Sequence, residues 1–254
     1  MNDVDLRGLD RMNALAKELA EDESHFKLPN LRPKDAATLI LIDNRGPIAK
    51  VLLGKRHHGH KFLPGKYVFP GGGLEPADQR MPTARPLDRH AEELLMRAVK
   101  RPSPDKARAL ALAAIRETYE ETGLLLGTPA RDTSAVPPGP WAAFAQAQIL
   151  PDLATIHFVA RAITPPRRPK RFDTRFFATD AGAIAHRIDG MIRPDAELVD
   201  LVWMPIGEAR NLDMPAITAV VLEELEVRIA AGLGHDLPVP FYQMLHRRFV
   251  RELL

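Results

Sequence analysis

The sequence predicts an α/β protein, and three observations lead to this prediction. The chain has 254 residues, of which 27% are charged and 45% hydrophobic, as is ordinary for a soluble globular protein. Short β-type runs bounded by turn residues recur along it, starting at 36–42 and 50–55. Two longer stretches, about 105–122 and 214–231, have helical character. The length is enough for one large domain or two small ones with a sizeable core.

The first third of the chain is predicted to form a helix, a linker and three strands. Residues 4–22 have apolar side chains near helical spacing, and we interpret them as a docking or dimer helix. Pro29 and Pro33 mark an extended linker, so residues 1–34 are taken as an N-terminal extension and 35–254 as the main domain. Strands are expected at 36–42, 50–55 and 67–69, the first two forming a hairpin around the turn residues 44–47.

The rest of the chain alternates helices and strands. A helix is expected at 88–100, followed by one from about 105 to 122 that Ser103 can cap and Gly123 can end. Further strands are expected at 155–163, 172–178 and 198–204. The last 40 or so residues are expected to be helical, most clearly over 214–231.

Charge and composition exclude several classes of protein. Lys and Arg number 35 and Asp and Glu 33, and this balance argues against a dedicated nucleic-acid-binding protein. The absence of cysteine excludes disulfides and thiolate chemistry and fits a reducing compartment. No apolar run approaches the ~20 residues that span a bilayer, and the acidic N-terminus fits neither a secretory signal nor a mitochondrial presequence. We therefore expect a cytoplasmic protein that contacts no membrane.

Three acidic side chains are close together on the helix that ends at Gly123. Glu117, Glu120 and Glu121 fall within about a third of the helix circumference. The opposite side is apolar and carries Leu112, Ile115 and Tyr119. Such a group of carboxylates is either a solvated acidic face or a site for a divalent cation, since Mg²⁺ and Mn²⁺ prefer several oxygen ligands.

A glycine-rich segment earlier in the chain adds to this pattern. Residues 69–73 read FPGGG, and glycines at the end of a strand let the backbone approach a metal or a phosphate closely. Together with residues 116–124 (RETYEETGL) this segment resembles the Nudix box, G-x5-E-x7-R-E-U-x-E-E-x-G-U, where U is apolar. Asp78 stands where the motif has its first Glu, and Thr118 stands at an apolar position. Between Asp78 and Arg116 lie 37 residues instead of seven, so the box carries an insertion at about 79–108.

The resemblance to the Nudix family covers roughly 36–212 and implies a fold and a reaction. The fold is an α/β/α sandwich with a mixed β-sheet, here joined by the N-terminal helix, the helical insertion and C-terminal helices. The reaction is hydrolysis of the pyrophosphate of a nucleoside diphosphate linked to another group, with Mg²⁺ or Mn²⁺ as cofactor. The implied partner is thus a small nucleotide derivative, and a homodimer stays open.

Site residues follow from the same resemblance. The implied metal ligands are the carboxylates and the carbonyls of the glycine turn: Gly71, Gly72, Glu117, Glu120 and Glu121. Glu120 and Glu121 are also assigned to catalysis, and Arg116 is expected to hold a carboxylate of the box in place. A further acid often comes from a later loop, and the candidate is Glu197, six residues before Trp203. A plain surface Glu at a strand start is the alternative.

The substrate is less well defined by the sequence. Residues 52–72 partly match the signature of Nudix enzymes that cleave CoA, which favours CoA or acyl-CoA as one candidate and Arg56 and Phe69 as substrate-binding residues. A basic run is formed by Arg167, Arg168, Lys170 and Arg171. It is either a solvated loop or a segment whose charge attracts substrate phosphates. The alternative function is a Nudix-fold nucleotide-binding or regulatory protein without catalysis, for which Asp78 and the insertion are the only indications.

Overall fold

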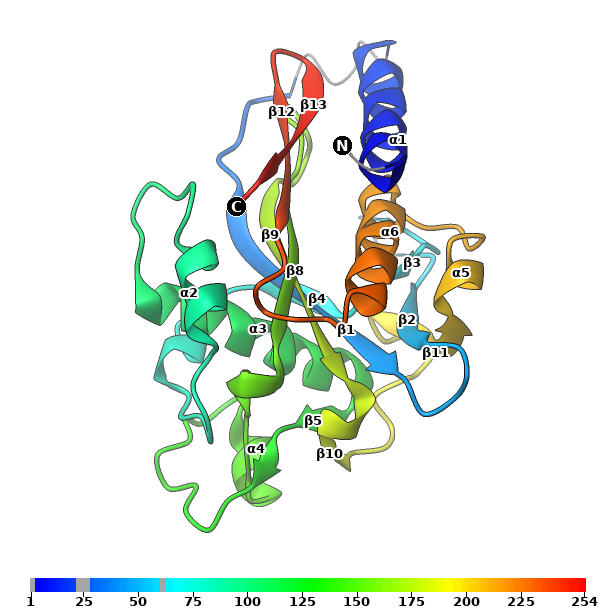
Figure 1. Cartoon of the computed structure of the whole chain (residues 1–254). Helices are drawn as coiled ribbons and strands as arrows, with labels where there is room; N and C mark the ends of the chain where they lie inside the picture. Colours follow the sequence, from blue (N-terminus) through cyan, green and yellow to red (C-terminus); the bar gives the residue numbers. More distant parts are fainter. Residues whose placement is uncertain (1–2, 22–27, 60–62) are drawn as a thin grey trace.

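A computed structural model of the chain describes residues 3–21, 28–59 and 63–254. Its centre is a mixed sheet with the strand order β11-β2-β1-β9-β8-β12-β13, in which β3 also pairs with β2 and β4 with β1. Helix α3 covers one face of the sheet, and α6 with α1 covers the other (Figure 1). The predicted α/β/α sandwich with a mixed sheet is therefore confirmed.

The helices are α1 (Asp3–Glu21), α2 (Arg89–Leu95), α3 (Pro104–Thr122), α4 (Ala142–Gln146), α5 (Ile206–Ala209) and α6 (Ala216–Ala230). The strands of the main sheet are β1 (Lys34–Asp43), β2 (Lys50–Arg56), β3 (Tyr67–Val68), β4 (Gly71–Gly73), β8 (His157–Ile163), β9 (Phe172–Asp180), β11 (Leu198–Pro205), β12 (Pro240–Leu245) and β13 (Arg248–Leu253). Two small sheets are formed by β5 (Leu124–Leu126) with β10 (Ile184–Arg187), and by β6 (Thr128–Pro129) with β7 (Ile149–Leu150).

The pairing of β1 positions the glycine-rich segment Gly71–Gly73, which forms strand β4 and is called the glycine turn below. β1 and β2 form the predicted antiparallel hairpin, and β9 runs parallel to β1 on its other side. The short strand β4 pairs antiparallel with β1, so that Thr38 lies opposite Gly71 and Ala36 opposite Gly73. The glycine turn is thereby attached to the middle of the sheet.

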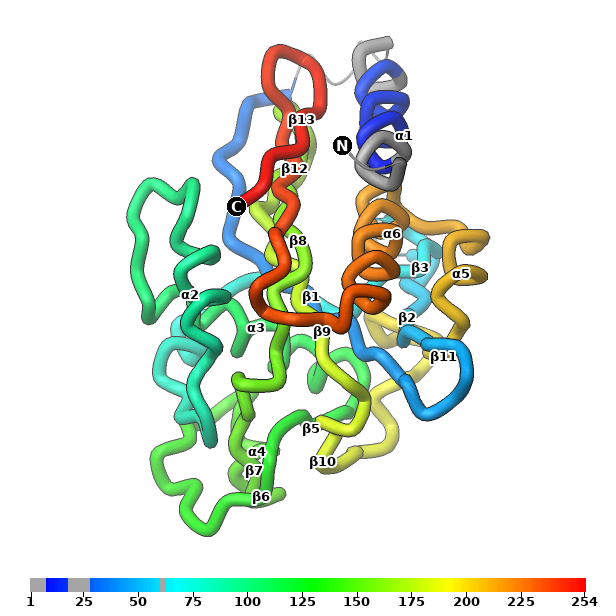
Figure 2. Tube along the Cα trace, viewed as in Figure 1, coloured from blue at the N-terminus to red at the C-terminus, as the bar shows by residue number. Residues whose placement is uncertain are grey.

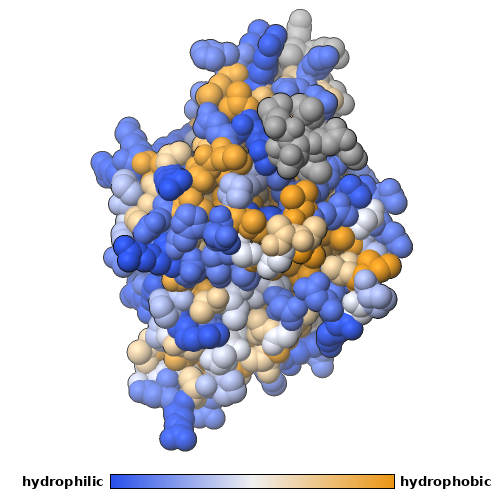
Figure 3. Space-filling model, in the orientation of Figure 1, coloured by the Kyte–Doolittle hydropathy of each residue, from blue (hydrophilic) through white to orange (hydrophobic). Residues whose placement is uncertain are grey.

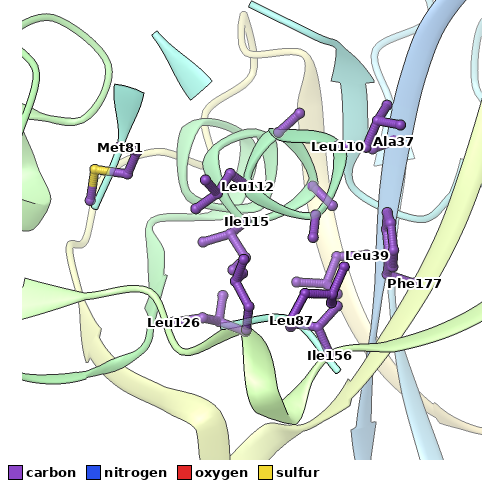
Figure 4. Close-up of a cluster of buried hydrophobic side chains, with 14 of the residues drawn as sticks. Ala37, Leu39, Met81, Leu87, Leu110, Leu112, Ile115, Leu126, Ile156 and Phe177 are labelled. Carbon is purple, nitrogen blue, oxygen red and sulfur yellow. The ribbon is translucent and has the colours of Figure 1, made fainter. Parts of the chain in front are cut away.

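Two apolar clusters fill the space on the two faces of the sheet. Alternate residues of β1 point to opposite faces: Leu39 and Leu41 belong to the cluster under α3, whereas Ile40 and Ile42 belong to the cluster under α6. Leu110, Leu112 and Ile115 of α3 belong to the same buried cluster as the sheet residues Leu39 and Phe177, and Figure 4 shows these side chains between the helix and the strands around it. This packing holds α3 at a fixed distance from β1 and β4.

Helix α3 begins and ends as its sequence predicts. The Ser103 hydroxyl accepts a hydrogen bond from the backbone N–H of Lys106, as an N-cap does. Gly123 ends the helix with φ of 77°, a left-handed conformation that glycine adopts without strain. The segment from Arg116 to Thr122 is thus the last two turns of a well-defined helix.

The segment 79–108 packs against the domain. Its residues Met81, Leu87, Leu94 and Leu95 are buried in the same cluster as the apolar face of α3. The helix expected at 88–100 is shorter than predicted, because α2 ends at Leu95 and the chain turns at Ala98, where φ is 51°. The insertion therefore contributes to the core.

The C-terminal region corrects one expectation. Helix α6 matches the predicted helix over 214–231, but the final residues are not helical: β12 and β13 form an antiparallel hairpin at the edge of the sheet (Figure 2). Phe241 and Tyr242 of β12 are buried, and β12 pairs in parallel with β8. Long-range pairing with the sheet outweighs the helical tendency of this segment.

The N-terminal helix packs within the chain. In α1, Met12 and Ala16 are buried in the cluster that also contains α6. The linker predicted after α1 lies partly outside the described residues. No helix in the described part of the chain is long and apolar enough to cross a membrane. The face shown in Figure 3 is mostly hydrophilic, with apolar residues gathered toward its middle.

Candidate active site

The glycine turn and the end of α3 are in direct contact, although 37 residues separate Asp78 from Arg116. The Nη2 atom of Arg116 donates to the carbonyl of Gly73 at 2.7 Å. The backbone N–H of Gly71 donates to Oε2 of Glu121 at 3.2 Å. The two halves of the interrupted motif are therefore adjacent in space.

Arg116 is the buried centre of this contact. Its side chain is 1% exposed, and its Nη1 atom donates to Oε1 of Glu117 at 2.9 Å and to Oε2 of Glu120 at 2.8 Å. Burial lowers the pKa of Arg116, but the hydrogen bonds and charges of Asp78 and Glu117 outweigh this and raise it above its ordinary value. The guanidinium therefore stays charged. Arg116 fixes two of the three acidic side chains of α3, in the geometry expected of a positioning residue.

Asp78 binds the other edge of the same guanidinium. Its Oδ1 accepts from Nε of Arg116 at 2.8 Å and from the indole N–H of Trp141 at 3.1 Å, and its Oδ2 accepts from the backbone N–H of Glu75 at 2.8 Å. The side chain is fully buried. Asp78 therefore anchors Arg116, and a longer Glu is not needed for that contact. No signal in the sequence pointed to Trp141, which lies 63 residues from Asp78.

The three acidic side chains of α3 differ in exposure. Glu121 is only 8% exposed, so it is not part of a solvated acidic face. Burial raises its pKa well above the usual value, and the charges of Glu197 and Glu117 raise it further. Burial also raises the pKa of Glu117, to about 7, against the opposing effect of Arg116. Glu120 is more exposed, and burial raises its pKa as well.

Two glycines allow the close approach of these carboxylates. A Cβ at Gly72 would overlap the carboxyl group of Glu117, and a Cβ at Gly71 would lie 2.6 Å from the carbonyl oxygen of Ala37. Any side chain at either position would displace the acidic group or the neighbouring strand. At Gly73, by contrast, a Cβ would meet open space.

Glu197 lines the same pocket as the glycine turn. It immediately precedes β11, and its Oε1 pairs with Nη2 of Arg56 at 2.9 Å. Its charge raises the pKa of both Glu117 and Glu121, so the three carboxylates are within electrostatic range of one another. Strand pairing between β2 and β11 places Arg56 and Glu197 together.

A pocket of about 680 Å³ lies beside the turn, on the α6 side of the sheet. Gly71, Gly72 and Glu197 line it together with the predicted substrate-binding residues Arg56 and Phe69. Phe69 is 5% exposed and belongs to the apolar cluster of this face, so only part of its ring is available to a ligand. The pocket has the size of a small-molecule site.

The donor set at the turn fits a divalent cation. Buried or half-buried carboxylates and backbone carbonyls are the oxygen ligands that Mg²⁺ and Mn²⁺ prefer, and the clash predicted at Gly72 shows a cradle shaped around Glu117. Among the described residues, no three acidic or His side chains are already gathered around a common point. Instead, Arg116 holds Glu117 and Glu120, while Glu121 is hydrogen-bonded to Gly71.

Comparison with known proteins relates the structure to Nudix hydrolases. No protein-family model matches the chain. Its structure is similar to that of a Nudix hydrolase from Alicyclobacillus acidocaldarius, with 27% identity and a TM-score of 0.57 over 78% of this chain and 96% of that one. More distant likenesses include the Nudix domain of Shewanella oneidensis NrtR in complex with ADP-ribose (16% identity, TM-score 0.44, 84% and 97% covered). A MutT protein from Methanosarcina mazei is as distant (15%, 0.42, 78% and 98%).

The first of these likenesses agrees with the site geometry. The mixed sheet between helices is the fold that the chain shares with this Nudix hydrolase. The chain belongs to the Nudix superfamily, and the particular feature of this member is the long segment inserted within its box.

Proposed function

We propose that the protein hydrolyses the pyrophosphate of a nucleoside diphosphate linked to another group, with Mg²⁺ or Mn²⁺ as cofactor. The observation that supports this most is that Glu117 and Glu121 lie against Gly72 and Gly71, two glycines that line the pocket together with Glu197. A diphosphate is repelled by carboxylates alone, so the site requires cations to accept it. A bound divalent cation supplies Lewis acidity and offsets the charge of the diphosphate.

In this proposal the residues of the site have separate roles. Glu117, Glu120 and Glu121, with the carbonyls of Gly71 or Gly72, would hold the cation, and Arg116 would keep Glu117 and Glu120 in place. Glu197 lines the pocket, and in this proposal it accepts a proton from the attacking water.

Arg56 lies beside Glu197 with its side chain 12% exposed, and it can donate two parallel hydrogen bonds to a phosphate. CoA and short acyl-CoA are candidate substrates because of the partial signature at 52–72. The partner is a small molecule, and the cytoplasm is the expected compartment.

The test is a substrate panel with purified protein. NDP-sugars, dinucleoside polyphosphates, ADP-ribose, NADH and CoA esters are incubated with Mg²⁺ or Mn²⁺, and the products are identified by mass. Glu121→Gln and Glu120→Gln are expected to lower the rate by about 100-fold or more, because each removes a charged ligand. The matched control is Glu93→Gln in α2, an exposed Glu outside the site.

Two outcomes would contradict the proposal. Full activity in the presence of EDTA, or undiminished turnover by both α3 variants, excludes a metal-dependent role for these carboxylates. Binding of nucleotides without turnover of any substrate supports the alternative, a nucleotide-binding protein that lacks catalysis.

A further inference from the structure

The pocket continues along β9 beyond the end of that strand. Phe172, Thr174 and Phe176 line it, and so does Lys170, two residues before β9 begins. Alternate residues of an extended chain point to the same side. Lys170 lies in a bend before the strand and adds a positive charge to the lining of the pocket.

Lys170 lies at the end of the pocket that is remote from the acidic site. Phe176 is paired with Thr38, which is paired with Gly71, so Phe176 marks the level of the glycine turn. Lys170 is six residues earlier, which at 3.3 Å per residue puts the two backbones up to about 20 Å apart. A flexible lysine side chain can shorten that gap by several ångströms.

The loop that carries Lys170 is fixed at its base. The Arg171 side chain donates to the carbonyl of Thr164 at 3.1 Å and to the carbonyl of Leu31 at 2.6 Å. The backbone N–H of Phe172 donates to the Thr164 hydroxyl at 3.0 Å. Arg171 is thus committed to holding the loop, whereas no carboxylate in the described part of the chain pairs with Lys170.

The middle of the pocket has a different character from its two ends. Between the level of the glycine turn and Lys170 it is lined by Ala36, Phe172 and Thr174, none of which carries a charge. A ligand that fills it would place a diphosphate at one end, an aromatic or apolar part in the middle, and an anionic group beside Lys170.

From this arrangement we propose that Lys170 binds a second phosphate of the substrate, remote from the bond that is cleaved. The substrates are then nucleoside diphosphate derivatives that carry an additional phosphate monoester. This inference rests on the proposed function, because it assigns the other end of the same pocket to the diphosphate.

The test compares ligands that differ by one phosphate. Hydrolysis is measured for NADPH against NADH and for CoA against dephospho-CoA, with wild type, Lys170→Ala and Lys170→Glu. We expect wild type to prefer the phosphorylated member of each pair by about tenfold in kcat/KM, as for one partly shielded ion pair. Lys170→Ala should remove this preference by raising KM for that member alone, and Lys170→Glu should reverse it. Lys50→Ala, at an exposed position outside the pocket, should behave as wild type.

A binding measurement separates the two proposals. Calorimetry with 3′,5′-ADP and with 5′-AMP reports the contribution of the additional phosphate without any hydrolysis. Equal affinities in wild type and Lys170→Ala, or a preference in turnover that survives Lys170→Ala, would overturn the assignment of Lys170 and leave the proposed hydrolysis intact. Absence of turnover with a lysine-dependent preference for 3′,5′-ADP would instead refute the hydrolysis and keep the phosphate site.

Discussion

At the scale of single residues, the site depends on the absence of a side chain at Gly72. Gly72 has no Cβ, and the carboxyl group of Glu117 occupies the space that a Cβ would fill. The neighbouring Gly73 is in the same strand and faces open space. The two glycines therefore form a natural pair for separating the effect of the carboxylate from the effect of backbone stiffening.

Gly72→Ala should lower the hydrolysis rate by at least about tenfold, because a shift of about 1 Å at a reacting centre has large kinetic effects. Gly73→Ala should change the rate much less. Steady-state kinetics on a substrate that the wild type hydrolyses gives both values, and thermal unfolding checks that both variants fold. Equal rates for the two variants would mean that the position of Glu117 is unimportant.

The carboxylates of α3 show how far single residues could be predicted. Spacing alone placed Glu117, Glu120 and Glu121 on one part of the helix, because helical geometry is local. The burial of Glu121 could not be predicted, since it follows from the contact with Gly71, a residue that folding brings close from 50 positions away. Asp78 was ambiguous for the same reason: its partner Trp141 is defined only by the tertiary structure.

At the scale of elements, the pair Asp78–Arg116 connects the segment before the insertion to the helix after it. Both side chains are almost completely buried. Removing one partner of such a pair leaves a charge without compensation in the interior. The stability of the connection therefore depends on both residues being present.

Asp78→Ala should lower the free energy of unfolding by about 3–5 kcal/mol, the typical cost of breaking a buried ion pair. Urea denaturation followed by circular dichroism measures it. Asp195→Ala, at an exposed carboxylate paired only loosely with Arg193, is the control and should change stability little. A loss below about 1 kcal/mol for Asp78→Ala would show that the pair does not stabilise the fold.

The C-terminal hairpin shows what element prediction missed. Its turn residues His246 and Arg247 have φ of 47° and 66°, values that usually call for Asn or Gly. Without that signal, the sequence gives no indication of a two-residue turn. The hairpin of β1 and β2 was predicted correctly, because there a Gly-Pro turn signal lies between two apolar runs.

At the scale of the whole molecule, the stability of the fold should depend on pH. His157 and His235 are stacked with ring centres 4.2 Å apart, and the Nδ1 atoms of both are buried without a hydrogen-bond partner in the described structure. Burial lowers the pKa of His157 to about 4, and His235 and Arg228 lower it further, against the effect of Asp88. Folding therefore favours the neutral form of His157.

Because the folded pKa is below the unfolded value of about 6.5, this contribution is present above pH 6.5 and is lost as the pH falls toward 4. We expect the free energy of unfolding to decrease by about 1–2 kcal/mol over that range from this group, after allowance for partial exposure. Urea titrations at several pH values measure the slope. His157→Gln should flatten it, and an unchanged slope in that variant would assign the pH dependence to other groups.

The 37 residues between Asp78 and Arg116 also make closure of the connecting loop entropically less favourable. Bringing together two points on a chain becomes less probable as the connection lengthens, and going from seven to 37 residues adds about 1.5 kcal/mol of loop-closure entropy. The buried pair and the apolar side chains of the insertion are what oppose this cost. The motif is accordingly a property of the folded conformation: in the unfolded ensemble its two parts meet rarely, and the cradle around Glu117 exists only after the rest of the domain has closed around it.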